Sequence, residues 1–142
     1  MKPIVCQTAA LNKYCDMSKC KCCQVQIPDD RKFCSNKCQA AETSRSTLEL
    51  WLNKKLVGHK GKVMNIKDFV RKYLLEKAGH KCCKCGWDKP HPISGTPPLE
   101  INHIDGDATN TWEDNLEVLC PNCHALTPNF KNRNKASKRK RK

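Results

Sequence analysis

Four cysteines in the C-terminal half of the chain have the spacing of metal ligands. They form two Cys-x-x-Cys pairs, which are Cys82 with Cys85 and Cys120 with Cys123. Each pair places two thiolates on one side of an ion, so two pairs can complete a tetrahedral Zn²⁺ site. The 34 residues between the pairs, 86–119, exceed the roughly 15–20 residues of a simple zinc ribbon. We therefore expect a structured insert, containing His103 and Asn115, inside the loop that zinc would close.

A second set of four cysteines predicts another structural Zn²⁺ site nearer the N-terminus. Its members are Cys20, Cys23, Cys34 and Cys38. Ten residues separate its two halves, which is enough for a hairpin around residues 27–30, and Cys38 is expected in the first turn of a helix capped at Ser35. Cys22 competes with Cys20 or Cys23 as a ligand. The other cysteines are interpreted as ordinary thiols, namely Cys6, Cys15, Cys22 and Cys83.

The abundance of cysteine also indicates a compartment. Twelve cysteines among 142 residues fit either disulfides in a secreted chain or metal sites in an intracellular one. Residues 1–14 contain no apolar run long enough for a signal peptide. No stretch approaches the roughly 20 apolar residues of a membrane helix, so no membrane partner is expected. We expect a cytoplasmic protein, in the host cell if the source is viral, whose thiols bind zinc.

The charge distribution favours a polyanionic partner that meets a local cation site. The formal net charge is +13, with +5 on residues 1–57, +5 on residues 58–81 and +8 on residues 131–142. Residues 82–130 instead carry −5, from two basic and seven acidic side chains. A basic chain with one acidic segment suits a nucleic-acid binder that holds a cation in that segment.

Helical periodicity dominates the region between the two cysteine sets. A helix is expected from about Ser35 to Leu56, followed by a linker at Gly58–Gly61. A second helix is predicted between an N-cap at Asn65 and a C′ residue at Gly79. Its apolar stripe consists of Ile66, Phe69, Val70, Tyr73 and Leu74.

Short strands are expected between the C-terminal cysteine pairs. Residues 99–104 alternate in polarity like a strand, Asp105-Gly106 is a turn signal, and residues 116–119 indicate a second strand. A short helix is expected after Pro121. The fold class predicted for the chain is α+β, built from small zinc-stabilised modules.

Two segments carry a family resemblance. They read Leu99-Glu-Ile-Asn-His-Ile-Asp-Gly-Asp107 and Glu113-Asp-Asn-Leu-Glu-Val-Leu-Cys-Pro-Asn-Cys-His124. Over about residues 80–128 the chain closely resembles the HNH nuclease family, which implies the ββα-metal (treble-clef-like) fold. The N-terminal cysteine module is similar to an accessory zinc finger of phage-type members. The expected organisation is a zinc-finger module at 1–40, a helical linker region at 41–79, an HNH domain at 80–130 and a basic disordered tail at 131–142.

The resemblance implies a role for each polar residue of the motif. His103 would be the general base, and Asn115 would hold His103 in position. His124 would bind a catalytic divalent metal, Mg²⁺ or Mn²⁺, and Asn102 would be a second ligand. Many members have Asp or His where this chain has Asn102, so the neutral amide implies weaker metal binding. Strand alternation places Asn102 and His103 on opposite faces unless the strand bends or ends there.

The resemblance implies an endonuclease acting on double-stranded DNA, of the homing type found in phages and mobile elements. Restriction or DNA packaging is the second biological role considered. The alternative function is a non-catalytic zinc-finger DNA-binding protein on an HNH-like scaffold, and a third is a protein-interaction module. The sequence leaves open nicking against double-strand cutting, and monomer against dimer.

Overall fold

The computed structural model describes residues 17–61 and 65–132 of the chain. The chain divides into two compact units, residues 1–47 and 48–142. Among the described residues, the first unit contains one two-stranded sheet and most of one helix, and the second contains two two-stranded sheets and shorter helices. The predictions for Cys6, Cys15 and the tail beyond residue 132 lie outside the described residues. Within the described ranges, no helix is long and apolar enough to cross a bilayer.

A hairpin opens the first unit. Strand β1 (Met17–Lys19) pairs in antiparallel fashion with β2 (Gln26–Pro28). The chain reverses between these strands, where the Cys20 N–H donates to the Val25 carbonyl at 2.9 Å and Gln24 has a φ of 63°. The prediction of a hairpin around residues 27–30 was therefore wrong, because the first cysteine pair itself occupies the turn.

Helix α1 (Asn36–Leu52) follows the second half of the cysteine set. The Cys38 N–H donates to the Ser35 hydroxyl at 3.3 Å, which confirms the predicted cap. The helix ends before the predicted Leu56, since Lys54 adopts a φ of 56° that an α-helix cannot continue. The division between the two units falls inside α1, after residue 47, whereas the sequence placed the end of the first module at residue 40.

The segment predicted as a linker is structured. Strand β3 (His59–Lys60) pairs in antiparallel fashion with β4 (Asn65–Ile66). Asn65 therefore lies in a strand and does not cap a helix. Helix α2 (Asp68–Lys77) begins after Lys67, which makes no side-chain cap, and Gly79 has the positive φ of 59° expected of a C′ residue.

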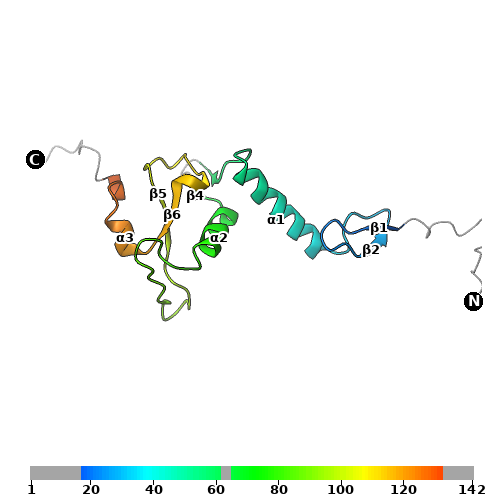
Figure 1. The fold of residues 1–142 in the computed structure, drawn as a ribbon, viewed down its shortest axis with the longest axis horizontal. Helices are drawn as coiled ribbons and strands as arrows, with labels where there is room; N and C mark the ends of the chain where they lie inside the picture. Colours follow the sequence, from blue (N-terminus) through cyan, green and yellow to red (C-terminus); the bar gives the residue numbers. More distant parts are fainter. Residues whose placement is uncertain (1–16, 62–64, 133–142) are drawn as a thin grey trace, which may run out of the picture. The chain divides into compact units, whose positions relative to one another are not determined.

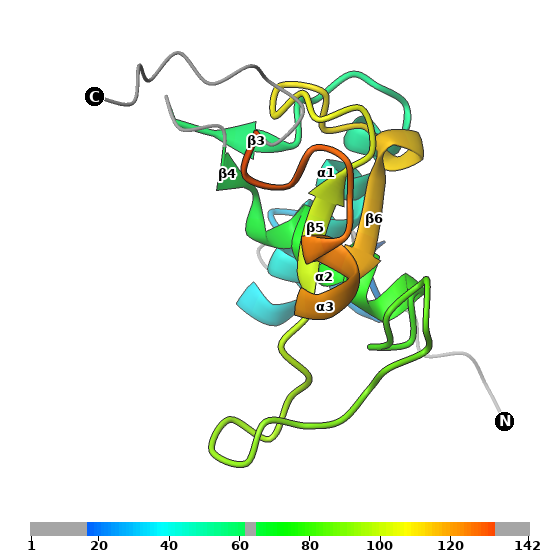
Figure 2. The same ribbon diagram turned by 90° about the vertical axis from the view of Figure 1, so that its left-hand side faces the viewer.

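A second hairpin and a short helix complete the second unit. Strand β5 (Glu100–His103) pairs in antiparallel fashion with β6 (Leu116–Leu119), and a 3₁₀ turn (Glu113–Asn115) leads into β6. Helix α3 (Pro121–Ala125) follows at once, and a further 3₁₀ turn (Phe130–Asn132) ends the described chain. Figures 1 and 2 show the β5–β6 hairpin between α2 and α3.

The core of the second unit combines residues from α1, α2 and the β5–β6 hairpin. Trp51, from the end of α1, is 1% exposed, and its Nε1 donates to the Thr111 carbonyl at 2.8 Å. The rings of Phe69 and Tyr73 meet the Trp51 ring edge to face. The region predicted as a helical linker thus contributes to the same core as the hairpin. The buried core residues are Trp51, Val70, Leu74, Cys82, Leu99, Leu116, Val118, Leu119 and Cys120.

Candidate metal centres and active site

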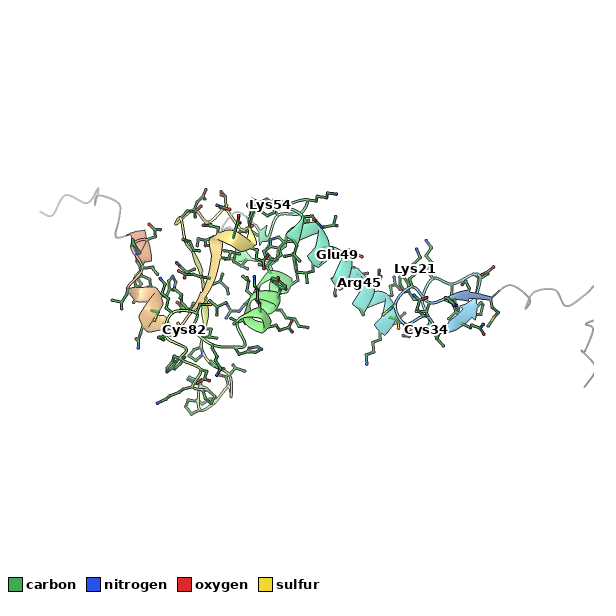
Figure 3. All side chains as sticks on the ribbon, in the orientation of Figure 1. Lys21, Cys34, Arg45, Glu49, Lys54 and Cys82 are labelled. Carbon is green, nitrogen blue, oxygen red and sulfur yellow. The ribbon has the colours of Figure 1, made fainter. Side chains whose placement is uncertain are left out.

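Four sulfur atoms converge beside the β5–β6 hairpin. They belong to Cys82, Cys85, Cys120 and Cys123, and they lie within 4.8 Å of one another (Cys82 in Figure 3). Cys120 precedes α3, and its Sγ accepts the Cys123 N–H at 3.4 Å. The Sγ atoms of Cys85 and Cys120 are 3.7 Å apart. Tetrahedral Zn–S bonds of about 2.3 Å require a separation of about 3.8 Å, so this set fits a structural Zn²⁺.

The thiols of this group differ in acidity. Burial opposes ionisation of Cys82, but backbone N–H groups, including those of Cys120 and Cys85, outweigh it and lower the pKa of Cys82 to about 6. The sulfur atoms of Cys85 and then Cys120 raise the pKa of Cys123 to about 12. Four clustered thiolates repel one another, so all four ionise together only with a positive ion among them.

The N-terminal set forms an equivalent group. The Sγ of Cys34 lies 3.5 Å from that of Cys23 and 3.4 Å from that of Cys38 (Cys34 in Figure 3). The Cys34 N–H donates to the Sγ of Cys20 at 3.4 Å. The pKa of Cys20 is lowered to about 6, foremost by the backbone N–H of Cys23. The group of four thus contains Cys20 and Cys23, and Cys22 lies outside it. This set also fits a structural Zn²⁺.

His124 lies on α3 and faces the start of β5. Its Nδ1 contacts the Glu100 carboxylate, at Oε2. The rings of His124 and Phe130 pack edge to face, with 5.2 Å between their centroids. The His124 N–H donates to the Cys120 carbonyl at 2.9 Å, so the ring is carried on the turn of helix that the cysteine group stabilises. An imidazole held through Nδ1 can bind a divalent metal through its other nitrogen.

Asn102 lies in the middle of the hairpin, opposite Glu117. It is 7% exposed, and its Nδ2 donates to the Glu117 Oε1 at 2.8 Å. Lys84 approaches the same oxygen at 3.4 Å. Because an ionised carboxylate only accepts hydrogen bonds, the amide nitrogen of Asn102 must face Glu117, and its Oδ1 is turned away from Glu117.

His103 is the last residue of β5 and lies opposite Leu116. Its Nε2 is buried and has no hydrogen-bond partner in the described part of the chain. Burial lowers the pKa of His103, and the charges of Asp105 and Asp107 oppose that shift. Strand alternation places His103 and Asn102 on opposite faces of β5. Because the strand ends at His103, the two side chains are not required to stay on opposite faces, which is the condition for both to belong to one site.

Asn115 fixes the turn that follows His103. Its Oδ1 accepts the Asp105 N–H at 3.1 Å, and its Nδ2 donates to the Asp105 Oδ1 at 2.9 Å and to the Asn110 carbonyl at 2.8 Å. Asp105 also accepts the Asp107 N–H at 2.8 Å. The amide thus fixes the backbone after His103, and the two aspartates accept hydrogen bonds from backbone N–H groups within the same turn.

Two residues of this region are missed by the sequence analysis. Glu100 shares a strand face with Asn102, because it lies two residues before it, and it contacts His124. Glu117 lies opposite Asn102 only through the register of the hairpin. Strand alternation could have indicated Glu100, whereas Glu117 requires a register that the sequence alone does not specify.

Two curated proteins resemble the chain over part of its length. It is 51% identical over 59 residues to the H-N-H endonuclease F-TflIV of Escherichia phage T5, which covers 39% of this chain and 23% of that protein. It is 37% identical over 60 residues to the type IV methyl-directed restriction enzyme EcoKMcrA of Escherichia coli K12, covering 39% of this chain and 21% of that protein. The chain thus matches less than a quarter of each relative. No family model and no solved structure matches.

Proposed function

We propose that this relative of the HNH endonucleases is a metal-dependent endonuclease that hydrolyses phosphodiester bonds in double-stranded DNA. The observation that carries the proposal is the placement of Asn102 and His103 on β5 and of His124 on α3, beside one group of four cysteines. The printed names of both relatives, an endonuclease and a restriction enzyme, support a nuclease. The order β5, β6, α3 supports a ββα-metal unit.

In this proposal His103 is the general base. Burial lowers its pKa, so the ring is neutral at physiological pH and its unpartnered Nε2 can accept a proton from an attacking water. Asn115 is a positioning residue, because it fixes the turn through which β5 ends at His103. The cysteine group takes no part in the chemistry and holds α3 against the hairpin.

The chain's donors fit a catalytic divalent cation. The imidazole of His124 and the Oδ1 of Asn102 would hold Mg²⁺ or Mn²⁺, and so few protein ligands leave positions for phosphate and water. When bound, the ion stabilises charge on the phosphate and on the leaving oxygen. Both groups of four cysteines would hold Zn²⁺, so the protein would carry two structural zinc ions.

Basic charge supplies the affinity for DNA in this proposal. Four thiolates on one Zn²⁺ carry a net charge of about −2. Two such sites reduce the formal charge from +13 to about +9, and the chain stays strongly basic. The first unit and the basic tail are proposed to add affinity through lysine and arginine contacts to phosphates. Such contacts weaken as salt rises and do not discriminate between DNA sequences.

One observation favours a second candidate, a non-catalytic DNA-binding protein on the same scaffold. Asn102 is neutral where many family members carry Asp or His, and its amide nitrogen is engaged with Glu117. A site too weak to hold a metal would bind DNA without cutting it. The two candidates differ in whether supercoiled plasmid survives incubation with the protein.

The test is cleavage of supercoiled plasmid by the zinc-loaded chain with Mg²⁺ or Mn²⁺. We expect nicked or linear DNA from the wild type and none from His103→Ala. The matched control is His80→Ala, at an exposed position after α2, which should cut normally. Circular dichroism and zinc content must be the same in both variants. Undiminished cutting by His103→Ala would overturn the proposed base, and a gel shift with intact plasmid under every metal would favour the second candidate.

The biological role that we propose is that of a homing-type enzyme of a phage or mobile element, acting in the host cytoplasm. The resemblance to a phage T5 endonuclease supports this role. The resemblance to a restriction enzyme supports restriction as the second role. Sequencing the ends of genomic DNA cut by the pure protein distinguishes them, since homing implies one long site and restriction implies frequent or modified sites.

A further inference from the structure

We infer that Glu100 and Glu117 are positioning residues that orient the two side chains holding the catalytic cation. The inference rests on the proposed function, because it concerns His124 and Asn102 as the metal-binding pair. Each of these side chains has one polar group against a carboxylate and one further donor atom. The carboxylates thereby decide which atom remains for an ion.

The first step concerns the tautomer of His124. An ionised carboxylate only accepts hydrogen bonds, so Glu100 selects the tautomer that carries its proton on Nδ1. The lone pair then lies on Nε2. Neutral imidazole alone prefers the opposite tautomer, with the proton on Nε2, so the contact with Glu100 reverses the intrinsic preference. A carboxylate behind a metal-binding histidine also raises the basicity of the ligand.

The second step concerns the amide of Asn102. Its Nδ2 donates to Glu117 at 2.8 Å across the hairpin, and Lys84 lies 3.4 Å from the same carboxylate oxygen. The amide is buried, so a rotation that exchanged its oxygen and nitrogen would set Oδ1 against a carboxylate in a site with little water. Glu117 therefore holds Oδ1, the only atom of Asn102 that can bind a cation, away from itself.

The pair also explains the departure from Asp at this position. An aspartate at position 102 would set two carboxylates against each other where Asn102 and Glu117 now share a hydrogen bond. The chain instead keeps a neutral ligand and supplies the negative charge from the neighbouring strand. An aspartate at this position is thus expected to improve metal binding only when Glu117 is also neutralised.

The test measures Mn²⁺ binding to the zinc-loaded full chain by electron paramagnetic resonance, without DNA. Outer-sphere partners of metal ligands typically contribute about 10–100-fold to metal affinity. We expect losses in this range for Glu100→Ala and Glu117→Ala, each of which removes the accepting carboxylate. Asn102→Asp alone should bind no more tightly than the wild type, whereas Asn102→Asp combined with Glu117→Gln should bind at least as tightly. The matched control Glu76→Ala removes an exposed carboxylate on α2 and should leave Mn²⁺ affinity unchanged.

Nitrogen-15 NMR of the same zinc-loaded chain without Mn²⁺ reads the tautomer of His124 directly. The wild type should carry the proton on Nδ1, and Glu100→Ala should move it to Nε2, which a purely structural role for Glu100 would not do. Wild-type affinity in both glutamate variants, or an unchanged tautomer in Glu100→Ala, overturns the inference. If these results were found while His103→Ala still failed to cut DNA, the inference about the glutamates would be wrong and the nuclease proposal would stand. Failure of the inference is therefore distinguishable from failure of the proposed function.

Discussion

Replacing Gly58 by alanine tests how closely the segment after α1 packs against Trp51 and Thr111. A Cβ at this position would lie 2.8 Å from Trp51 Nε1 and 3.0 Å from both the carbonyl and the hydroxyl oxygen of Thr111. Trp51 and Thr111 are each 1% exposed, and they are joined by a hydrogen bond of 2.8 Å. Neither neighbour has room to withdraw, so the added methyl group overpacks the core at a cost of about 1–3 kcal/mol.

The assay is thermal unfolding followed by circular dichroism at saturating zinc. A unit of this size loses about 4–8 °C of Tm per kcal/mol, so Gly58→Ala should unfold about 4–24 °C below the wild type. Trp51→Phe removes the nitrogen nearest to the new methyl group, so the alanine substitution should cost less in that background. A shift below about 4 °C, or an equal cost in both backgrounds, would refute the packing of Gly58 against Trp51 and Thr111.

Three further predictions concern zinc, acid stability and pH. Cys82→Ser should reduce bound zinc from two ions to one by mass spectrometry, whereas Cys83→Ser, outside the sulfur group, should leave both. Lys77 Nζ lies 2.5 Å from Glu113 Oε1, and this contact is the main reason that the pKa of Glu113 is lowered. The pair therefore stabilises the fold fully at a pH above the unfolded pKa of about 4.3. That stabilisation is lost as the pH falls through the lower pKa of the folded state. Glu113→Gln should therefore lower the free energy of unfolding by about 0.2–1 kcal/mol at pH 7, because Lys77 is largely exposed, and by much less below a pH of about 3, measured in urea. Burial lowers the pKa of His103, and a general base works in its unprotonated form. The cleavage rate should therefore rise with pH, with a midpoint below the ordinary histidine pKa of about 6.5. A midpoint above that value would contradict the assignment of His103 as the base.

Local patterns were sufficient where neighbours in sequence determine the structure. The spacing of the cysteines predicted both groups of four, and strand β6 has the predicted bounds of residues 116–119. The predicted cap at Ser35 and the short helix after Pro121 are also confirmed. The resemblance to the HNH endonuclease family is confirmed by the two curated relatives.

The failures share a physical reason, which is dependence on contacts distant in sequence. Gly58 was interpreted as part of a linker, but the backbone there lies so close to Trp51 and Thr111 that there is no room for a Cβ atom. Asn65 has the chemistry of a helix cap, yet its pairing with Lys60 places it in a strand. Glu117 gained a role only through its register with Asn102. No local pattern specifies these partners.

The central claim is that one group of four cysteines holds β5 and α3 around a second, catalytic cation. Anomalous diffraction from crystals of the zinc-loaded chain soaked in Mn²⁺ tests it most directly. The account predicts zinc peaks among the four sulfur atoms of each cysteine group and a manganese peak bonded to His124 Nε2 and Asn102 Oδ1. A manganese peak elsewhere, or no ion among Cys82, Cys85, Cys120 and Cys123, would contradict it.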